Sequence, residues 1–385
     1  MPRHPPCASQ TAAGDTREHT ETMPKTTALA PPAQDHKAAI VRDGRRVTSY
    51  DVALVAGVSQ SAVSRCFKPG ASVSKSTYAR VMKAAAGLDY IPNAAARSLI
   101  TRRSNIVGII ISNRANLYYP EALSELSMQI TRHGRRALLF TLEREADIGR
   151  LLPDVWQYQV DGVIAAAAMS DAQRDEFTRR GVPLVLFNRA GGTPGAHAVL
   201  CDQQEAARTL VSRLAAAGHR QFGIIDGPED STVARERRVG ACARLAELGL
   251  PAPMVVRGQF DYDSGARGLR ELIAQLGRVP DAIICGSDLM AIGCLDHARH
   301  ALGLDVPGQL SVAGFDAVDS SGWLSYNLTT MRQPIAQMAL AAADMLETLI
   351  HSRDTAPERR LFGAQLIDGA TARLQALCDD DTLAA

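Results

Sequence analysis

A run of short polar side chains from Ser59 to Arg65 has the chemistry to hydrogen-bond the edges of DNA bases. Ser59 is a favourable helix cap, so the residues after it would form the first turns of a helix. A helix fits the DNA major groove, where each base pair presents its own pattern of donors and acceptors. The side chains that we expect this helix to expose are Gln60, Ser61 and Ala62 in its first turn, and Ser64 and Arg65 later.

A second short helix is expected just before this one, joined to it by a tight turn. Thr48 and Asp51 form a T-x-x-D capping box, which marks a helix start. Gly57 can adopt the left-handed backbone that ends such a helix. Two helices joined in this way are typical of a helix-turn-helix that reads DNA, although an ordinary αα-hairpin would give the same local pattern. The residues expected near a small core are Val52, Leu54 and Val55.

A third, amphipathic helix is expected after Ser74, and a distinctive segment follows it. Its apolar positions at helical spacing are Val81, Ala84, Ala85 and Leu88. The chain reads V-T-x-x-D-V-A-x-x-A-G-V-S-x-x-x-V-S-R over residues 47–65 and G-L-D-Y-I-P-N-x-x-A-R-S-L over residues 87–99. With these two motifs the chain resembles the lac repressor (LacI/GalR) family of bacterial transcription regulators. The resemblance extends from about Val47 to about Arg373.

The charge distribution agrees with a nucleic-acid-binding segment near the N-terminus. Between Val41 and Arg103 there are eleven basic and three acidic side chains, a net charge of +8, whereas the whole chain carries +1. The rest of the chain is therefore acidic. A basic segment on an acidic body is expected of a DNA-binding module attached to a ligand-sensing domain. Lys68, Lys75 and Arg80 would contact phosphates, which position a protein on DNA without specifying sequence.

The resemblance implies that the segment from Pro92 to Leu99 is a hinge helix. Pro92 suits the first position of a helix, but an isolated helix this short is unstable in water. It would form when paired with its dimer mate in the minor groove, where Leu99 would enter a base step and kink the duplex. A plain flexible linker is the alternative. The DNA-binding residues implied by the resemblance are Thr48, Tyr50, Ser59, Gln60, Ser61, Ala62, Ser64, Arg65, Lys68, Asn93, Arg97 and Leu99.

From residue 105 onward, apolar runs alternate with helical patterns, which predicts parallel sheets covered by helices on both faces. The strand-like runs are 106–111, 136–142, 161–168, 183–188, 221–226, 254–256, 281–285 and 310–315. The helical patterns include 203–217, 232–248, 263–276, 288–301 and 335–350. The expected fold class is therefore α/β, an N-terminal helix-turn-helix DNA-binding head followed by a two-lobed core of parallel sheets similar to periplasmic binding proteins.

The predicted domains follow from these patterns. They are a disordered N-terminal extension (1–45), a helix-turn-helix domain (46–90), a hinge (91–103), a ligand-binding core (104–377) and an acidic tail (378–385). Within the core, lobe 1 takes residues 104–203 and 332–360, and lobe 2 takes residues 204–331 and 361–377. The extension is rich in Pro, Ala, Thr and charge without periodicity, which is typical of disorder. It departs from the family pattern, and Met23 is an alternative start.

The resemblance also implies a ligand cleft between the lobes, lined by side chains that follow strand ends. Arg237 matches the ligand-clamping arginine in the register A-R-x-R-x-x-G, and its donors suit hydroxyls or a carboxylate. Ser287 stands where the family usually has an amide, which leaves the ligand's identity open. Each cleft residue also has an alternative role as a helix cap, a surface cation or a core side chain. The effector-binding residues implied are Tyr118, Tyr119, Asn188, Arg237, Phe260, Ser287 and Asp316.

Cysteine usage and the terminal segments bear on the compartment. The seven cysteines occur singly without metal-ligand spacing, as expected of reduced thiols in the cytoplasm. The N-terminal segment lacks the apolar region of a secretory signal, and no apolar run is long enough to cross a bilayer. We therefore expect a cytoplasmic protein without membrane contact. The short acidic C-terminus lacks sustained leucine heptads, which favours a dimer over a tetramer.

The first hypothesis for function is a ligand-responsive transcriptional repressor that binds double-stranded, pseudo-palindromic operator DNA as a homodimer. Its small-molecule effector would be a sugar or sugar derivative, with a purine or another metabolite as the alternative. A solute-binding protein for transport and an enzyme of sugar or nucleoside metabolism are the competing hypotheses. The sequence contains no G-x-S-x-G, H-E-x-x-H or G-x-x-x-x-G-K motif, so we expect no enzyme activity, metal or cofactor.

Overall fold

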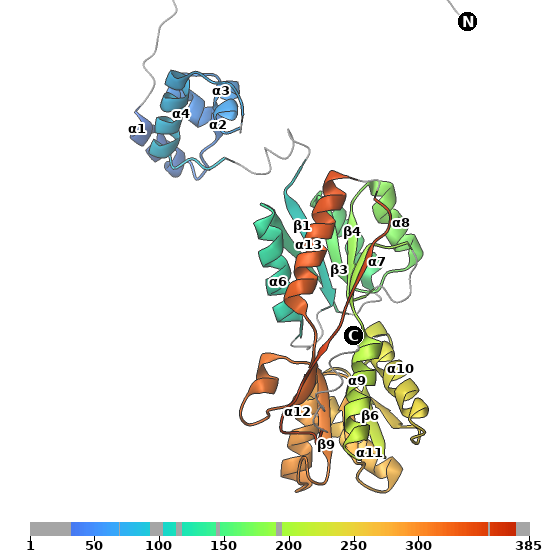
Figure 1. The fold of residues 1–385 in the computed structure, drawn as a ribbon. Helices are drawn as coiled ribbons and strands as arrows, with labels where there is room; N and C mark the ends of the chain where they lie inside the picture. The colour runs from blue at the N-terminus through green and yellow to red at the C-terminus, as the bar shows by residue number, and fades with distance from the viewer. Residues whose placement is uncertain are drawn as a thin grey trace, which may run out of the picture. The chain divides into compact units, whose positions relative to one another are not determined.

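The computed structural model describes residues 32–68, 70–92, 103–112, 118–143, 147–189, 195–352 and 355–374. The chain divides into two compact units, residues 1–97 and 98–385. Figure 1 shows that the first unit is helical and that the second contains two sheets with helices packed around them.

In the described residues the first unit, here called the head, contains four helices around one small core. Val52 and Val63, on neighbouring helices, are fully buried in this core, together with Val81 and Leu88. Gly57 has a φ of 62° and ends the second helix, as the sequence predicted. The helices are α1 (Ala33–Arg42), α2 (Ser49–Ala56), α3 (Gln60–Cys66) and α4 (Lys75–Gly87).

The predicted helix caps are confirmed, but one predicted core residue is wrong. Ser59 Oγ accepts a hydrogen bond from the backbone N–H of Ala62 at 3.3 Å, and Ser74 Oγ accepts one from Thr77 at 3.2 Å. Leu54 was expected in the core, yet 52% of it is exposed. It follows Val52 by two positions, and side chains two positions apart in a helix point to different sides.

The prediction of disorder through residue 45 is wrong for α1. This ten-residue helix packs on α2 and α4, and Ile40 is 1% exposed within the head. The sequence A-Q-D-H-K-A-A-I-V-R has only two large apolar side chains, and these are adjacent, so no repeat of large apolar residues at helical spacing marks the helix. Tertiary contacts therefore decide its helical structure, because a short helix gains most of its stability from packing. Residues 1–31 lie outside the described part of the chain.

Lobe 1 of the second unit is a six-stranded parallel sheet in the order β11-β5-β4-β3-β1-β2. Its strands are β1 (Ile106–Ser112), β2 (Arg136–Leu142), β3 (Gly162–Ala166), β4 (Leu184–Phe187), β5 (Ala198–Cys201) and β11 (Arg359–Phe362). One face packs on α6 (Tyr118–Arg132) and α13 (Ile335–His351), and the other packs on α7 (Ile148–Gln157) and α8 (Asp171–Arg180).

Lobe 2 has the same plan, with strands in the order β12-β10-β9-β8-β6-β7, of which β12 alone among the described strands runs antiparallel to its neighbour. Its strands are β6 (Phe222–Asp226), β7 (Met254–Arg257), β8 (Ala282–Cys285), β9 (Ser311–Asp316), β10 (Thr329–Arg332) and β12 (Gln365–Ile367). Its helices are α9 (Gln203–Ala216), α10 (Thr232–Glu247), α11 (Tyr262–Leu276) and α12 (Asp288–Asp296), with a π-helical turn η2 (His297–Ala301) and a 3-10 turn η3 (Asp319–Gly322).

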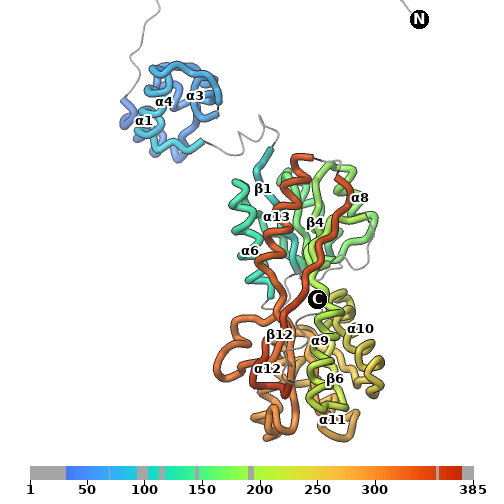
Figure 2. Tube along the Cα trace, in the orientation of Figure 1, coloured from blue at the N-terminus to red at the C-terminus, as the bar shows by residue number. Residues whose placement is uncertain are grey.

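The chain passes between the lobes at three places, which the tube in Figure 2 makes easy to follow. The connections run from β5 to α9, from β10 to α13 and from β11 to β12. The eight strands expected from the sequence are all present. Strands β10, β11 and β12 were missed because each contains only one or two apolar residues, and β5 was missed as well. None of the helices in the described residues is long and apolar enough to cross a membrane.

Candidate nucleic-acid interface and ligand site

The start of α3 carries side chains that were predicted to read bases, and it lies beside the start of α2. Gln60 Nε2 donates a hydrogen bond to Ser49 Oγ at 3.2 Å, which joins the first residue of each helix. Ser61 and Arg65 are exposed, and Ser64 is half-buried. Positions three and four apart share one side of a helix, so these side chains form one accessible face of α3.

Ala62 does not belong to this face. It is 9% exposed, because it lies on the side of α3 that carries the fully buried Val63. The prediction that Ala62 is exposed for base contact is therefore wrong, and its described role is to donate its backbone N–H to Ser59 Oγ.

Cationic and polar groups surround the accessible face of α3. Arg65, Lys68 and Lys75 line one hollow, together with Tyr78, between the end of α3 and the start of α4. At the start of α2, Thr48 is exposed and Tyr50 is 73% exposed. Such groups suit contacts to DNA phosphates. The predicted hinge residues Asn93, Arg97 and Leu99 lie outside the described residues.

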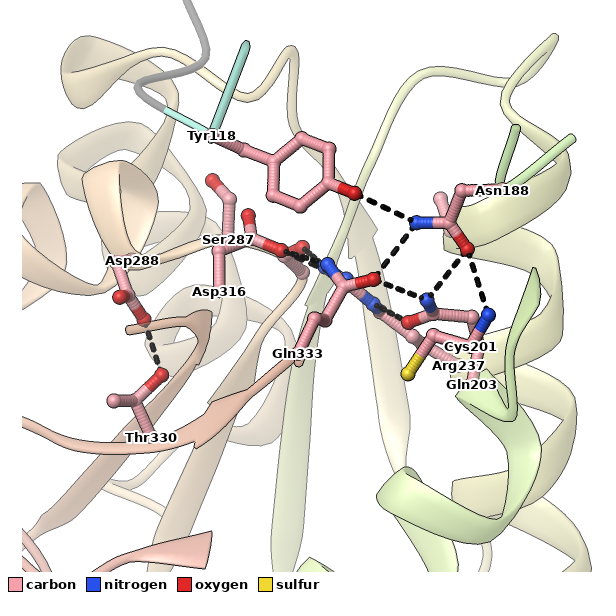
Figure 3. Close-up of polar contacts among 12 residues, drawn as sticks. Tyr118, Asn188, Cys201, Gln203, Arg237, Ser287, Asp288, Asp316, Thr330 and Gln333 are labelled. Carbon is pink, nitrogen blue, oxygen red and sulfur yellow. Dashed lines mark hydrogen bonds and ion pairs between the residues drawn. The ribbon is translucent and has the colours of Figure 1, made fainter. Parts of the chain in front are cut away.

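In the second unit, four of the predicted ligand residues meet in one buried polar network that joins the lobes (Figure 3). Asn188 follows β4 of lobe 1, and its Nδ2 donates to Tyr118 Oη at 3.3 Å and to Gln333 Oε1 at 2.7 Å. Gln333 lies on the connection from β10 to α13, and its Nε2 donates to Asp316 Oδ1 of lobe 2 at 2.9 Å. The network therefore runs from one lobe to the other through Gln333.

Arg237 is the other centre of this network. It lies in the first turns of α10, and its guanidinium donates to Gln203 Oε1 at 2.8 Å, to the backbone oxygen of Gly286 at 2.7 Å and to Asp316 Oδ1 at 2.8 Å. It also lies 4.4 Å from the centre of the Phe315 ring. These contacts fix the plane of the guanidinium, so the surface-cation alternative for Arg237 is wrong.

Asp316 is only partly satisfied by the protein. Its Oδ1 accepts from Arg237 and Gln333, whereas Oδ2 is buried and has no hydrogen-bond partner among the described residues. A buried acceptor without a partner costs about 1–3 kcal/mol relative to a satisfied one. A molecule bound here that offers a hydroxyl or N–H donor would remove this cost.

Backbone strain gathers at the same strand ends. Asn188 has a φ of 55°, Phe260 has 62° and Asp316 has 107°, all in the region that favours glycine. Such conformations cost about 1–3 kcal/mol each and cluster where a protein must hold side chains for binding or catalysis. The backbone of these three predicted ligand residues is therefore compatible with a functional site, but five other non-glycine residues of the described chain, including Asp89 of the head, share a positive φ.

The remaining predicted ligand residues have clear structural contacts. Tyr119 is buried, and its hydroxyl accepts a hydrogen bond from Arg189 at 2.7 Å. Phe260 is buried in the core of lobe 2, where Gly227 leaves room for its ring. Ser287 is the N-cap of α12, and its Oγ accepts from the backbone N–H of Met290 at 3.4 Å. These contacts agree with the core alternative for Tyr119 and Phe260 and make Ser287 a helix cap, and they leave a second role toward a ligand untested.

Two residues of the network were missed by the sequence analysis. Gln203 is the first residue of α9, and its Nε2 donates to Gln333 Oε1 at 2.8 Å and to Asn188 Oδ1 at 3.2 Å. Both glutamines lie on connections between the lobes, where neither a motif nor apolar periodicity marks them. For Gln333 the sequence shows only a polar residue beside Pro334, because the strand that precedes it was not predicted.

Burial changes the proton affinity of several groups near the network. Burial raises the pKa of the Tyr118 hydroxyl above its ordinary value, and the negative charge of Asp316 adds to this effect. Burial also raises the pKa of the Asp288 carboxyl well above its usual range, and Asp316 again contributes. Burial raises the pKa of the Cys201 thiol to about 12, so this thiol stays protonated at neutral pH. Among the described residues, no group of three or more His, Cys, Asp and Glu side chains could hold a metal ion.

Two family models match the chain. The model described as bacterial regulatory proteins, lacI family, covers residues 48–93, and the periplasmic binding protein-like domain covers residues 211–372. Catabolite control protein A of Priestia megaterium is 31% identical over 305 residues, which is 78% of this chain and 91% of that protein. The chain belongs to the lacI family of bacterial regulatory proteins.

Solved structures of similar regulators also match most of the chain. A lac repressor dimer bound to operator and the anti-inducer ONPF is 26% identical, with a TM-score of 0.78 over 85% of this chain and 99% of that chain. The transcriptional regulator CelR in complex with cellobiose is 28% identical, with a TM-score of 0.65 over 85% of this chain and 100% of that chain. These relatives are transcriptional regulators rather than enzymes, and this family member is a ligand-responsive, DNA-binding transcriptional regulator.

Proposed function

We propose that this regulator represses transcription by binding a pseudo-palindromic operator as a homodimer, and that a small hydroxylated effector bound between its lobes changes operator affinity. The observation that carries the effector proposal is Asp316 Oδ2, a buried carboxylate oxygen without a partner among the described residues. A sugar hydroxyl supplies the donor that this oxygen lacks.

Several contacts support a sugar or sugar derivative as the effector. Arg237, Asn188 and Gln333 place donors and acceptors around Asp316, and Tyr118 adds a ring beside them. Polar groups of this kind with aromatic neighbours are typical of sites for small polar ligands. The similar regulator CelR holds cellobiose. A purine or another metabolite is the second candidate, because amide and carboxylate groups also pair with base edges. The effector-binding residues proposed are Tyr118, Tyr119, Asn188, Arg237, Phe260, Ser287 and Asp316.

The head is proposed to place the accessible face of α3 in the major groove. Gln60, Ser61, Ser64 and Arg65 would contact bases, while Thr48, Tyr50 and Lys68 would contact the phosphates beside them. One head reaches only a few base pairs, so useful specificity requires two heads on a near-palindromic site. From the resemblance alone, Asn93, Arg97 and Leu99 are proposed to bind the minor groove as part of a paired hinge.

A surface of lobe 2 supports the proposed homodimer. Trp323 is 61% exposed and Leu324 is fully exposed, directly after η3. Tyr262 and Tyr326 lie near this segment and share Asp296 as hydrogen-bond acceptor, at 2.9 and 3.3 Å. Large exposed apolar side chains of this kind mark interaction sites. In the proposed dimer, an effector that changes the angle between the lobes changes the separation of the paired hinges and thus operator affinity.

The test of the proposed function is binding of the full chain to labelled promoter fragments and to random duplexes over a range of salt concentrations. We expect a preference for one promoter, an affinity that falls steeply with salt, and a shift of that affinity by one metabolite of a sugar-rich panel. Leu99→Gly should keep effector binding and lose most operator affinity. Equal binding to all duplexes, with and without metabolites, would overturn the proposal.

We further propose that the protein acts in the cytoplasm and catalyses no reaction. The support is the similarity to transcriptional regulators over most of the chain. Assays of the purified protein for turnover of the metabolite that shifts its DNA affinity test the second part.

A further inference from the structure

Helix α1 is a docked element of the head, and three separate contacts hold it. Ile40 is buried in the head. Ala33 lies against Gly87 of α4, where an added Cβ would stand 2.9 Å from the Ala33 Cβ, so small residues on both helices allow their close approach. Lys37 forms an ion pair with Asp89, just after α4. The orientation of α1 on α2 and α4 is therefore fixed at both of its ends.

Several hydrogen bonds to Asp51 hold the turn from α1 into α2. Arg45 grips Asp51 with two hydrogen bonds of 2.8 and 2.7 Å, and the same carboxylate accepts from the backbone N–H of Thr48 at 2.8 Å. His36 of α1 contacts Asp51 Oδ1 at 2.9 Å. The Arg45 guanidinium, followed by the hydrogen bonds from Thr48 and His36, holds the pKa of Asp51 below its usual range against the opposing effect of burial. Gly44, with a φ of 63°, reverses the chain between the two helices.

The three arginines around this turn differ in their ion pairs. All three are exposed, but Arg45 is neutralised by an ion pair with Asp51, whereas Arg42 and Arg46 form no ion pair among the described residues. Arg46 has no hydrogen bond or ion pair among the described residues, and Arg42 makes one long hydrogen bond of 3.4 Å to the backbone of its own helix. Two unneutralised cations are thus presented by a rigid turn, without the ordering cost of a flexible arm.

The place of this turn in the head identifies its partner. Arg46 precedes Thr48 by two residues, and Ser49 at the start of α2 is hydrogen-bonded to Gln60 of α3. In a helix-turn-helix the first helix crosses the DNA backbone while the second enters the groove. In the proposed complex the start of α2 would therefore lie at the phosphates that flank the bases read by α3. Arg46 comes just before this helix start in the chain, and Arg42 is the last residue of α1, which leads into it.

We propose that α1 and its basic turn form an additional phosphate-binding surface, in which Arg42 and Arg46 contact the DNA backbone beside the bases read by α3. This inference rests on the proposed operator binding. Because phosphates carry no direct sequence information, the surface raises affinity for all duplexes and leaves the choice of operator unchanged.

The experiment compares the full-length wild type with the double variant Arg42→Gln/Arg46→Gln, which removes both charges from exposed positions and keeps polar side chains. Operator affinity is measured by fluorescence anisotropy at several salt concentrations. Each lost phosphate contact reduces the steepness of log affinity against log salt by about 0.9. The double variant loses two contacts in each head, so we expect a reduction of about 1.8 for every head that is bound to the operator. The ratio of operator to random-duplex affinity should stay within about twofold, as expected of pure phosphate contacts.

Lys83→Gln is the matched control, because Lys83 is an exposed cation of α4 that takes no part in the proposed contacts. Ile40→Ala is the second variant; by loosening α1 it should lower the melting temperature of the head and reduce the salt slope as well. An unchanged slope in the double variant, or an equal loss in Lys83→Gln, overturns the inference. Wild-type protein that binds no DNA overturns the proposed function instead.

Discussion

Asn188 and Gln333 are joined by a 2.7 Å hydrogen bond from Nδ2 to Oε1. The other end of the Gln333 amide donates to Asp316, so one side chain connects the last residues of a lobe 1 strand to those of a lobe 2 strand. Rotation of one lobe against the other must change these hydrogen bonds. Gln333 therefore lies where an effector could bias the orientation of the lobes.

The first prediction concerns Gln333→Ala. It removes the hydrogen bonds from Gln333 to Asn188, Gln203 and Asp316, which keep their other partners, so the free energy of unfolding should fall by about 1–3 kcal/mol. Effector affinity should fall about tenfold or more, because the groups that meet the effector are no longer held in place. Calorimetric titration and urea unfolding measure the two effects. Gln275→Ala, at an exposed position of α11, is the control, and a Gln333→Ala protein with wild-type effector affinity contradicts the proposed site.

Arg237→Ala should abolish the effector response while effector-free operator binding remains. The change leaves the buried Asp316 carboxylate without its cation, which should cost about 3–5 kcal/mol of stability. Arg237→Lys keeps the charge but cannot reach Gln203, Gly286 and Asp316 together, so its response should be weak. Operator binding with and without effector, well below the melting temperature, separates the outcomes. A normal response in Arg237→Ala removes Arg237 from the site.

Two substitutions at Ser287 distinguish a role as helix cap from a role in effector binding. Ser287→Ala should lower stability by about 0.5–2 kcal/mol through loss of the α12 cap, whereas Ser287→Asn, an equally good cap, should not. If Ser287 contacts the effector, Ser287→Asn should change which metabolites stabilise the protein in a thermal-shift panel, because an amide then replaces the hydroxyl. Identical metabolite profiles for wild type and both variants would show that Ser287 is a cap and nothing more.

His219 predicts a pH dependence of stability. It is fully buried between the backbone oxygen of Leu214 and Ser311 Oγ, both at 2.8 Å, and burial lowers its pKa. Below about pH 6.5 the histidine is therefore protonated in the unfolded chain but stays neutral in the folded chain. The contribution of neutral His219 to the free energy of unfolding is complete above that pH and is lost as the pH falls.

Urea unfolding of the wild type and of His219→Gln at pH 7.5 and 5.5 measures this contribution. The variant should be less stable at the higher pH and should lose less stability on acidification than the wild type. His300→Gln, at an exposed histidine, is the control. Equal pH dependence in wild type and His219→Gln would contradict the assignment.

The sequence predicted those helix ends, turns and strands that depend on residues close together in the chain. The caps at Ser59 and Ser74, the turn at Gly57 and the strand from Arg136 to Leu142 are where the sequence predicted them, because hydrogen-bonding side chains, glycine conformation and apolar periodicity act over a few residues. The resemblance to the lac repressor family likewise placed Arg237 and Asp316 at one site, and the two side chains are in contact in the structure.

Tertiary packing decided what local signals could not. Helix α1 is stabilised by packing on α2 and α4, where Ala33 lies against Gly87 and Ile40 is buried, whereas its own sequence offers only two adjacent large apolar residues as a signal. Ala62 is buried and Leu54 is exposed because the neighbouring helices determine which face of each helix packs on the core. Gln203 and Gln333 lie in the polar network because two connections between the lobes come into contact. That contact joins residues far apart in the chain, so local spacing could not predict it.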